Sequence, residues 1–168
     1  MKVIETERLA IRWLSTDDAA FIMELLNTPS WIRFIGDRGI RTIGDARNYI
    51  VGGPMDMYAK LGFGLYAVEL KDSLTPIGIC GLIKRDSLDD VDIGYAFLPS
   101  FWGQGYAYEA ARAVVHYGRK QLKLDRIIAI TTIDNLSSIN LLEKLGFQFE
   151  RMVQFDNEEL KLYANVIK

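Results

Sequence analysis

The sequence VDIGYAFL at Val91–Leu98 runs directly into PSFWGQGYA at Pro99–Ala107, and this junction decides the fold that we predict. A strand pattern ends in a loop with two glycines, and the loop opens into a run with helical periodicity. Glycines let backbone N–H groups turn toward one point, and a helix N-terminus adds about half a positive charge. No Lys or Arg occurs between Ile93 and Tyr108. The junction therefore indicates either a phosphate site made of main-chain amides or a tight turn whose glycines only allow close packing.

Two other phosphate-binding motifs are excluded at this junction. A Walker loop requires a Gly followed by Lys and Ser or Thr, and no Gly here has these neighbours. A dinucleotide fingerprint requires a third Gly after Gly103-Gln104-Gly105, and Tyr108 occupies that position.

The residues before the junction predict strands and two helices. Leu9–Trp13 alternates as a half-buried strand. Capping-box signals predict one helix from Ser15, with Asp18 three residues on and Pro29 at its end, and a second helix from Thr42, with Asp45, stopped at Gly52-Gly53. Three strand patterns with short connections then favour an antiparallel meander. They cover Gly64–Leu70, Ile77–Ile83 and Val91–Leu98.

The residues after the junction complete one mixed sheet. Gly105–Leu122 has helical periodicity and a stripe of small residues suited to close packing on a sheet. The remaining patterns are a strand, a short helix and a terminal hairpin, at Arg126–Thr132, Asn135–Leu145, and 147–155 with 160–167. The order β-α-α-β-β-β-α-β-α-β-β predicts an α/β protein with a mixed sheet. No linker divides the chain, so we expect a single domain over residues 1–168.

Composition excludes several classes of protein. Twenty Lys and Arg against 22 Asp and Glu give a net charge of −2, which disfavours general nucleic-acid binding. One cysteine, Cys80, and one histidine, His116, exclude a disulfide framework and the usual His/Cys zinc sites, so we expect no metal. They also disfavour a Ser-His-Asp or Cys-His hydrolase. No secretory signal or membrane-spanning run occurs, and we expect a cytoplasmic protein.

The junction resembles the pyrophosphate loop of the GNAT N-acetyltransferases, whose general form is Arg/Gln-x-x-Gly-x-Gly/Ala. Gly105 and Ala107 match its last two positions, and Trp102 replaces the Arg or Gln. The RimJ/RimL-like form Pro-x-x-Trp-Gly-x-Gly-Tyr-Ala is matched throughout Pro99–Ala107. The resemblance covers nearly the whole chain, in register. Its other matching segments are Thr6–Arg12, Asp92–Tyr95, Asn135–Ser138 and Glu143–Phe147.

This resemblance implies the GNAT fold and transfer of an acetyl group from acetyl-CoA to a primary amine. The amine attacks directly in a ternary complex, without a covalent enzyme intermediate. The acceptor implied is a protein N-terminus, such as that of a ribosomal protein, or a small amine such as a polyamine, amino acid or antibiotic. The partners are therefore acetyl-CoA and an amine, in a monomer or a homodimer.

The resemblance also assigns residues that bind acetyl-CoA. Exposed backbone at Phe97 and Leu98 would pair with the pantetheine arm as a pseudo-strand, which requires a splayed edge facing Arg126–Thr132. The side chain of Asn135 would bond the same arm, although a helix-entry turn also explains this residue. Main-chain amides would hold the pyrophosphate. They belong to Gly103, Gln104, Gly105, Tyr106 and Ala107.

The amine arrives as an ammonium and needs a base. Strand alternation places Asp92, Gly94 and Ala96 on one face of the central strand. Asp92 is where the family often has an acidic residue, so it is the first candidate base, and its alternative is a solvent-facing carboxylate. Glu69 and Glu159 are the other candidates.

The thiolate that leaves needs an acid, and here the sequence departs from the family. Many GNAT enzymes use a Tyr in the late helix, but the matching residue is Leu142. Ser138 is the substitute, with a helix-capping hydroxyl as its alternative function. The missing Tyr leaves open a catalytically silent acyl-CoA-binding or sensor module.

The early helical region forms the acceptor wall in the family. Its aromatic and aliphatic residues here either line the acceptor pocket or belong to the core. They are Trp31, Ile32, Phe34 and Tyr49. A cluster of carboxylates either attracts a cationic acceptor or forms a solvated turn. It consists of Asp86, Asp89, Asp90 and Asp92.

Overall fold

A computed structural model describes residues 1–167 and contains one eight-stranded mixed sheet. The strand order is β1-β2-β3-β4-β5-β6-β8-β7, and only the β5–β6 pair is parallel. The strands are β1 (Lys2–Glu5), β2 (Leu9–Trp13), β3 (Leu65–Leu70), β4 (Pro76–Ile83), β5 (Asp92–Phe97), β6 (Arg126–Thr131), β7 (Gln148–Phe155) and β8 (Glu158–Val166). The predicted mixed sheet and its antiparallel β3–β4–β5 meander are confirmed.

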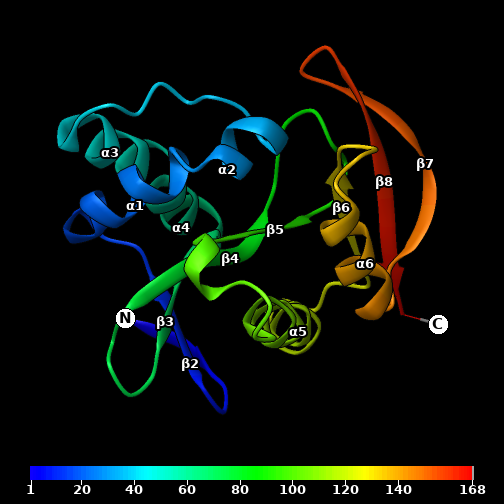
Figure 1. The fold of residues 1–168 in the computed structure, drawn as a ribbon. Helices are drawn as coiled ribbons and strands as arrows, with labels where there is room; N and C mark the ends of the chain where they lie inside the picture. The colour runs from blue at the N-terminus through cyan, green and yellow to red at the C-terminus, as the bar shows by residue number, and fades with distance from the viewer. Residues whose placement is uncertain (168) are drawn as a thin grey trace.

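Helices cover both faces of the sheet, so the protein has three layers (Figure 1). One face is packed by α5 and α6, and the opposite face by α1, α2 and α3, with α4 after them in the chain. The helices are α1 (Ala19–Leu26), α2 (Pro29–Phe34), α3 (Ile43–Ile50), α4 (Asp56–Leu61), α5 (Tyr106–Lys120) and α6 (Leu136–Lys144). No helix of the described residues is long and apolar enough to cross a membrane.

The early helical region differs from the prediction in two places. Both capping boxes form, but Pro29 begins the further helix α2, because proline is tolerated at a helix start and Thr28 caps the amide of Trp31. The Gly52-Gly53 pair does not stop α3. A π-helical turn over Val51–Met55 carries the chain into α4, which ends at Gly62 in the left-handed conformation. The strand β1 was also absent from the prediction.

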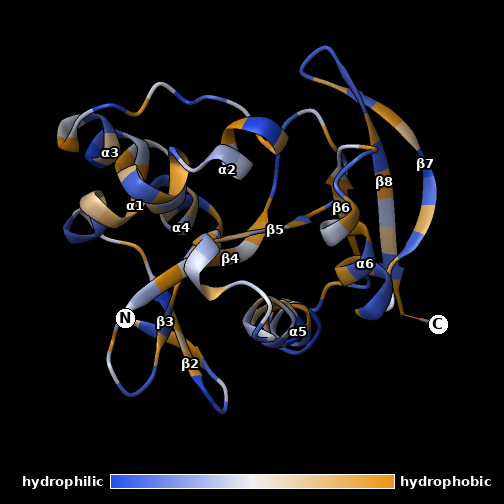
Figure 2. Cartoon of the chain, viewed as in Figure 1, coloured by the Kyte–Doolittle hydropathy of each residue, from blue (hydrophilic) through white to orange (hydrophobic). Residues whose placement is uncertain are grey.

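The small-residue stripe of α5 allows this helix to pack closely on the sheet, as predicted. Ala110, Ala111 and Val114 are fully buried against it. A Cβ atom at Gly118 would lie 3.0 Å from Leu82 Cδ1, so the helix backbone approaches β4 where only a glycine fits without adjustment. Figure 2 shows hydrophobic residues along β4 and β6 beneath the helical layers.

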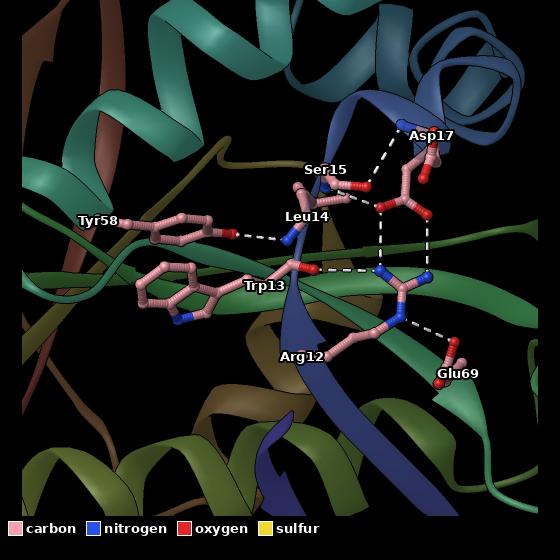
Figure 3. Close-up of polar contacts among 8 residues, drawn as sticks. Arg12, Trp13, Leu14, Ser15, Asp17, Tyr58 and Glu69 are labelled. Carbon is pink, nitrogen blue, oxygen red and sulfur yellow. Dashed lines mark hydrogen bonds and ion pairs between the residues drawn. The ribbon is translucent and has the colours of Figure 1, made fainter. Parts of the chain in front are cut away.

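A buried ion-pair network ties β2 to the helical layer above it (Figure 3). Arg12 donates to Glu69 on β3 at 2.9 Å and to both carboxylate oxygens of Asp18 at 2.9 Å. Asp18 in turn accepts from the amide of Ser15, the residue that opens the first helical turn. Because Glu69 and Asp18 are 8% and 7% exposed, one arginine compensates two desolvated carboxylates.

We expect Arg12→Met to destabilise the protein by about 3 kcal/mol, because it leaves two buried carboxylates without a counter-charge. The matched control is Arg33→Met, which breaks the exposed Arg33–Asp134 pair and is expected to cost less than about 1 kcal/mol. Urea unfolding followed by circular dichroism measures both changes. Equal destabilisation by the two variants would contradict this account of the network.

Candidate active site

The strands β5 and β6 separate after one residue pair. Asp92 pairs with Ile128, and the amide of Ile128 donates to the carbonyl of Val91 at 3.0 Å. The other neighbouring strands of the described sheet are paired over three or more positions. The splayed edge that the pantetheine assignment requires is therefore present, on the β6 side of β5.

A cleft of about 780 Å³ lies at this splay. Its walls come from β5, the junction loop, the start of α5, the β6–α6 region and the α2–α4 layer. Eight of the ten predicted site residues line it, and Leu98 and Gln104 do not. The eight are Asp92, Phe97, Gly103, Gly105, Tyr106, Ala107, Asn135 and Ser138.

The junction loop presents an uncapped helix N-terminus to the cleft. Gly103 and Gly105 have φ values of +76° and +85°, which non-glycine residues rarely adopt. Gly105 is the N-cap of the 15-residue helix α5, and no side chain of the described residues caps it. Trp102 Nε1 donates to the carbonyl of Phe97 at 2.8 Å and fixes the loop to the end of β5. The geometry fits an anion site made of amides.

A second set of contacts fixes the loop from the N-terminal strands. Glu109 in the first turn of α5 accepts from Thr6 Oγ1 at 2.5 Å and from Arg8 Nε at 2.7 Å. Burial would raise the pKa of Glu109, but these hydrogen bonds lower it. Arg8 also donates to the carbonyl of Gln104 at 2.9 Å and lies 4.3 Å from the centre of the Tyr106 ring. These contacts give the Thr6–Leu9 segment, which the sequence singled out, a positioning role.

The backbone at the end of β5 is divided between the two neighbouring strands. The amide of Leu98 donates to the carbonyl of Ile77 on β4 at 2.9 Å. Since successive residues of a strand direct their N–H and C=O groups to opposite edges, those of Phe97 and Tyr95 face the splay. At the far wall, Asn135 accepts from the amide of Ser138 at 3.3 Å and caps α6.

Asp92 is buried at the point where the two strands part. It is 1% exposed, and Arg85 Nε lies 3.2 and 3.3 Å from its two carboxylate oxygens. Burial raises the pKa of Asp92 to about 6, against the opposing effect of Arg85. The alternative of a solvent-facing carboxylate is therefore wrong. The other candidate bases lie outside the cleft lining: Glu69 is bound to Arg12, and Glu159 is exposed on β8.

A hydroxyl pair that the sequence did not predict lies across the cleft wall. The hydroxyl of Tyr95 on β5 is 2.7 Å from Ser138 Oγ on α6. Burial raises the pKa of Tyr95, so this hydroxyl keeps its proton at neutral pH. Ser138 does not cap its helix, since Asn135 does. The alternation on β5 already placed Tyr95 opposite Asp92, but no local signal connects it with residue 138.

The structure shows which residues of the predicted acceptor wall and of the carboxylate cluster line the cleft. Trp31, Phe34 and Tyr49 line the cleft, whereas Ile32 is 41% exposed and does not. Of the clustered carboxylates only Asp92 lines it; the other three lie outside, and Asp90 pairs with Arg126. Within the described residues, no group of three or more His, Cys, Asp or Glu side chains could hold a metal ion.

Comparison with known proteins agrees with this fold. Residues 8–148 match the family model described as "Acetyltransferase (GNAT) domain". The chain is 30% identical over 154 residues to the uncharacterized N-acetyltransferase YoaA of Bacillus subtilis, covering 90% of this chain and 86% of that protein. It superposes on a GNAT-family acetyltransferase from Bacillus anthracis with a TM-score of 0.80 and 29% identity, over 97% of each chain.

A third relative shares the fold at low sequence identity. RimL, a ribosomal L7/L12 α-N-protein acetyltransferase solved in complex with coenzyme A, superposes with a TM-score of 0.83 and 16% identity. The alignment covers 99% of this chain and 98% of RimL. The fold and the cleft together define an acyltransferase, and the chain belongs to the GNAT acetyltransferase family.

Proposed function

We propose that this protein transfers the acetyl group of acetyl-CoA to a primary amine in the cleft between β5 and β6, as RimJ/RimL-like enzymes do. The observation that carries the proposal is the position of the uncapped α5 N-terminus at one end of a splay whose other end holds a buried carboxylate. The acceptor is a protein N-terminus or a small amine.

The cofactor half of the cleft fits acetyl-CoA. The amides from Gly103 to Ala107 would bind the pyrophosphate, and the Phe97 N–H, which faces the splay, would donate to an amide carbonyl of pantetheine, whereas the Phe97 carbonyl already accepts from Trp102 Nε1. Asn135 lies on the opposite wall, where its side chain would reach the same arm. RimL, which has this fold, was solved with coenzyme A.

In this proposal, the base and the acid lie on opposite faces of β5. Strand alternation puts Asp92 on the face that α1, α2 and α3 cover, and Tyr95 contacts Ser138 on the α6 side. Asp92 would take a proton from the ammonium, directly or through water, and the free amine would attack the thioester carbon. As the C–N bond forms and the C–S bond breaks, the thiolate would take a proton from Tyr95, which Ser138 orients.

Turnover decides between this function and a catalytically silent acyl-CoA-binding module. Thiol release is measured with acetyl-CoA and a panel of peptides, amino acids, polyamines and aminoglycosides, and calorimetry measures acetyl-CoA binding. We expect saturable binding and thiol release with at least one amine. Binding without turnover on any amine would favour the catalytically silent module over the enzyme. The absence of acetyl-CoA binding would exclude both functions.

The anion site predicts a charge effect at Gly103, where an added Cβ would meet no atom within 4 Å. Gly103→Glu and Gly103→Gln carry the same backbone strain at φ +76° and differ in charge. We expect the Glu variant to bind coenzyme A at least about tenfold more weakly than the Gln variant, because its carboxylate repels the pyrophosphate. Equal dissociation constants in calorimetry would place the pyrophosphate elsewhere.

The base predicts a pH profile. A base must be deprotonated, so kcat/KM should rise with pH through the pKa of Asp92 at about 6 and rise further as the amine itself deprotonates. In Asp92→Asn the inflection near pH 6 should disappear, with activity at pH 7 lower by about 100-fold and recovering at high pH. An unchanged profile in a folded variant would exclude Asp92 as the base.

The acid predicts a specific loss in turnover. Tyr95→Phe removes the hydroxyl that donates to the thiolate, so kcat should fall by about 10- to 100-fold while the dissociation constant of coenzyme A stays unchanged. Tyr108→Phe, which removes another hydroxyl from the cleft lining, is the matched control and should keep its activity. Equal kcat values for the two variants would remove Tyr95 from the reaction.

A further inference from the structure

The charges that line the cleft are few and unevenly placed. Of all lining residues only Arg38, Arg85 and Asp92 carry a full charge. Arg85 and Asp92 pair with each other, which leaves the charge of Arg38 in excess. A cationic acceptor such as a polyamine would therefore meet a site with net positive charge, whereas an acceptor that brings its own anion would compensate it.

These arginines lie away from the pyrophosphate loop. Arg85 contacts Asp92 at the start of β5, whereas Phe97 ends the strand next to the loop. Along an extended strand, Asp92 and Phe97 are about 16 Å apart. Arg38 follows α2 on the acceptor side. Both guanidinium charges act on the hydroxyl of Tyr49: burial raises the pKa of Tyr49, and Arg38 and Arg85 lower it. Arg38, Arg85 and Tyr49 all line the same cleft, so the two cations share its acceptor half.

Both arginines keep donors available. Arg85 uses only Nε for Asp92, and within residues 1–167 its two Nη groups make no hydrogen bond. The Arg85 guanidinium also lies 5.1 Å from the centre of the Phe155 ring, which holds it in place. Arg38 makes no hydrogen bond or ion pair among the described residues. Guanidinium groups with free paired N–H donors are suited to a carboxylate.

The Arg85–Asp92 contact limits the distance between the amine of an acceptor bound to Asp92 and an anionic group of the same acceptor bound to Arg85. An ammonium that donates to Asp92 and a carboxylate that accepts from Arg85 would sit next to each other, because the two side chains are 3.2 Å apart. An α-amino acid has this separation between its amine and its carboxylate. A peptide N-terminus does not, since its α-carboxyl group is an amide.

The remaining walls suit an apolar side chain. Trp31, Phe34 and Tyr49 contribute aromatic rings to the lining, and Met57 adds a flexible apolar group. Trp31 is 5% exposed, and its Nε1 has no hydrogen-bond partner within the described residues. Trp31 therefore contributes apolar ring surface to this wall, and its Nε1 is buried too deeply to contact a ligand.

We propose that the acceptor is a free α-amino acid with an apolar side chain, and that Arg38 and Arg85 bind its carboxylate beside the amine. This proposal rests on the proposed function, because it concerns the acceptor half of the same cleft. Arg38 is the specificity-determining residue that a substitution can test, since removing Arg85 would leave the buried Asp92 unpaired.

The test compares amino acids with their amides, which keep the amine and side chain and lose the negative charge. Phenylalanine, leucine and alanine, each beside its carboxamide, are titrated by calorimetry into the protein loaded with coenzyme A, which binds without reacting. We expect at least one amino acid to bind about tenfold or more tightly than its amide. Arg38→Gln should abolish the preference and Arg38→Lys should restore part of it. Arg33→Gln, an exposed arginine of α2 outside the lining, should leave it unchanged.

Equal binding of acids and amides, tighter binding of the amides, no binding of any pair, or a preference that survives Arg38→Gln would overturn the proposal. The same pairs are then assayed for thiol release with acetyl-CoA. Preferential binding of amino acids without thiol release would contradict the proposed acetyl transfer and leave the carboxylate site in place. Thiol release with amides or spermidine in preference to amino acids would contradict the carboxylate site and leave acetyl transfer in place.

Discussion

The loss of hydrogen bonding between β5 and β6 determines the chemistry available to this protein. Beyond Asp92 and Ile128 the two strands no longer pair, although both remain within one sheet. The backbone groups of Tyr95 and the N–H of Phe97 are thereby turned toward a cleft and away from a neighbouring strand, whereas the Phe97 carbonyl accepts from Trp102 Nε1. Unpaired peptide groups are costly to bury, so a peptide-like ligand that pairs with them is favoured at this place.

The rest of the fold keeps that gap open. On one side α5 is held close to β4 and β5 by its small residues, and the contacts of Glu109 with Thr6 and Arg8 fix where the helix starts. On the other side the helical layer is joined to β2 and β3 through Arg12 (Figure 3). Both α5 and the helical layer are thus fixed to the paired part of the sheet.

In the proposed reaction, the central strand β5 also separates the two proton transfers that amide formation needs. Strand alternation directs Asp92 to one face of β5 and Tyr95 to the other. Asp92 would therefore accept the proton of the amine on one side of the thioester, and Tyr95 would donate a proton to the thiolate on the opposite side. Burial raises the pKa of both groups, in each case because it disfavours the charged form. The carboxylate becomes a stronger base, and the phenol retains the proton that it would donate.

The sequence by itself determined the loop and most of the elements, although not β1, α2 and α4, because their signals are local. Turn residues and the period of the hydrophobic pattern predicted the meander and α5. The spacing of the residues Gly103–Ala107 predicted the anion site. The partnerships of the cleft were decided only by the tertiary structure. Tyr95 meets Ser138 from 43 residues away, and Arg38 and Arg85 line one cleft from separate segments of the chain. The chain likewise continues from α3 through Gly52-Gly53 as a π-helical turn in which Pro54 is buried. Local patterns fix how a segment folds, whereas side chains distant in the chain meet only once the sheet and its layers have formed.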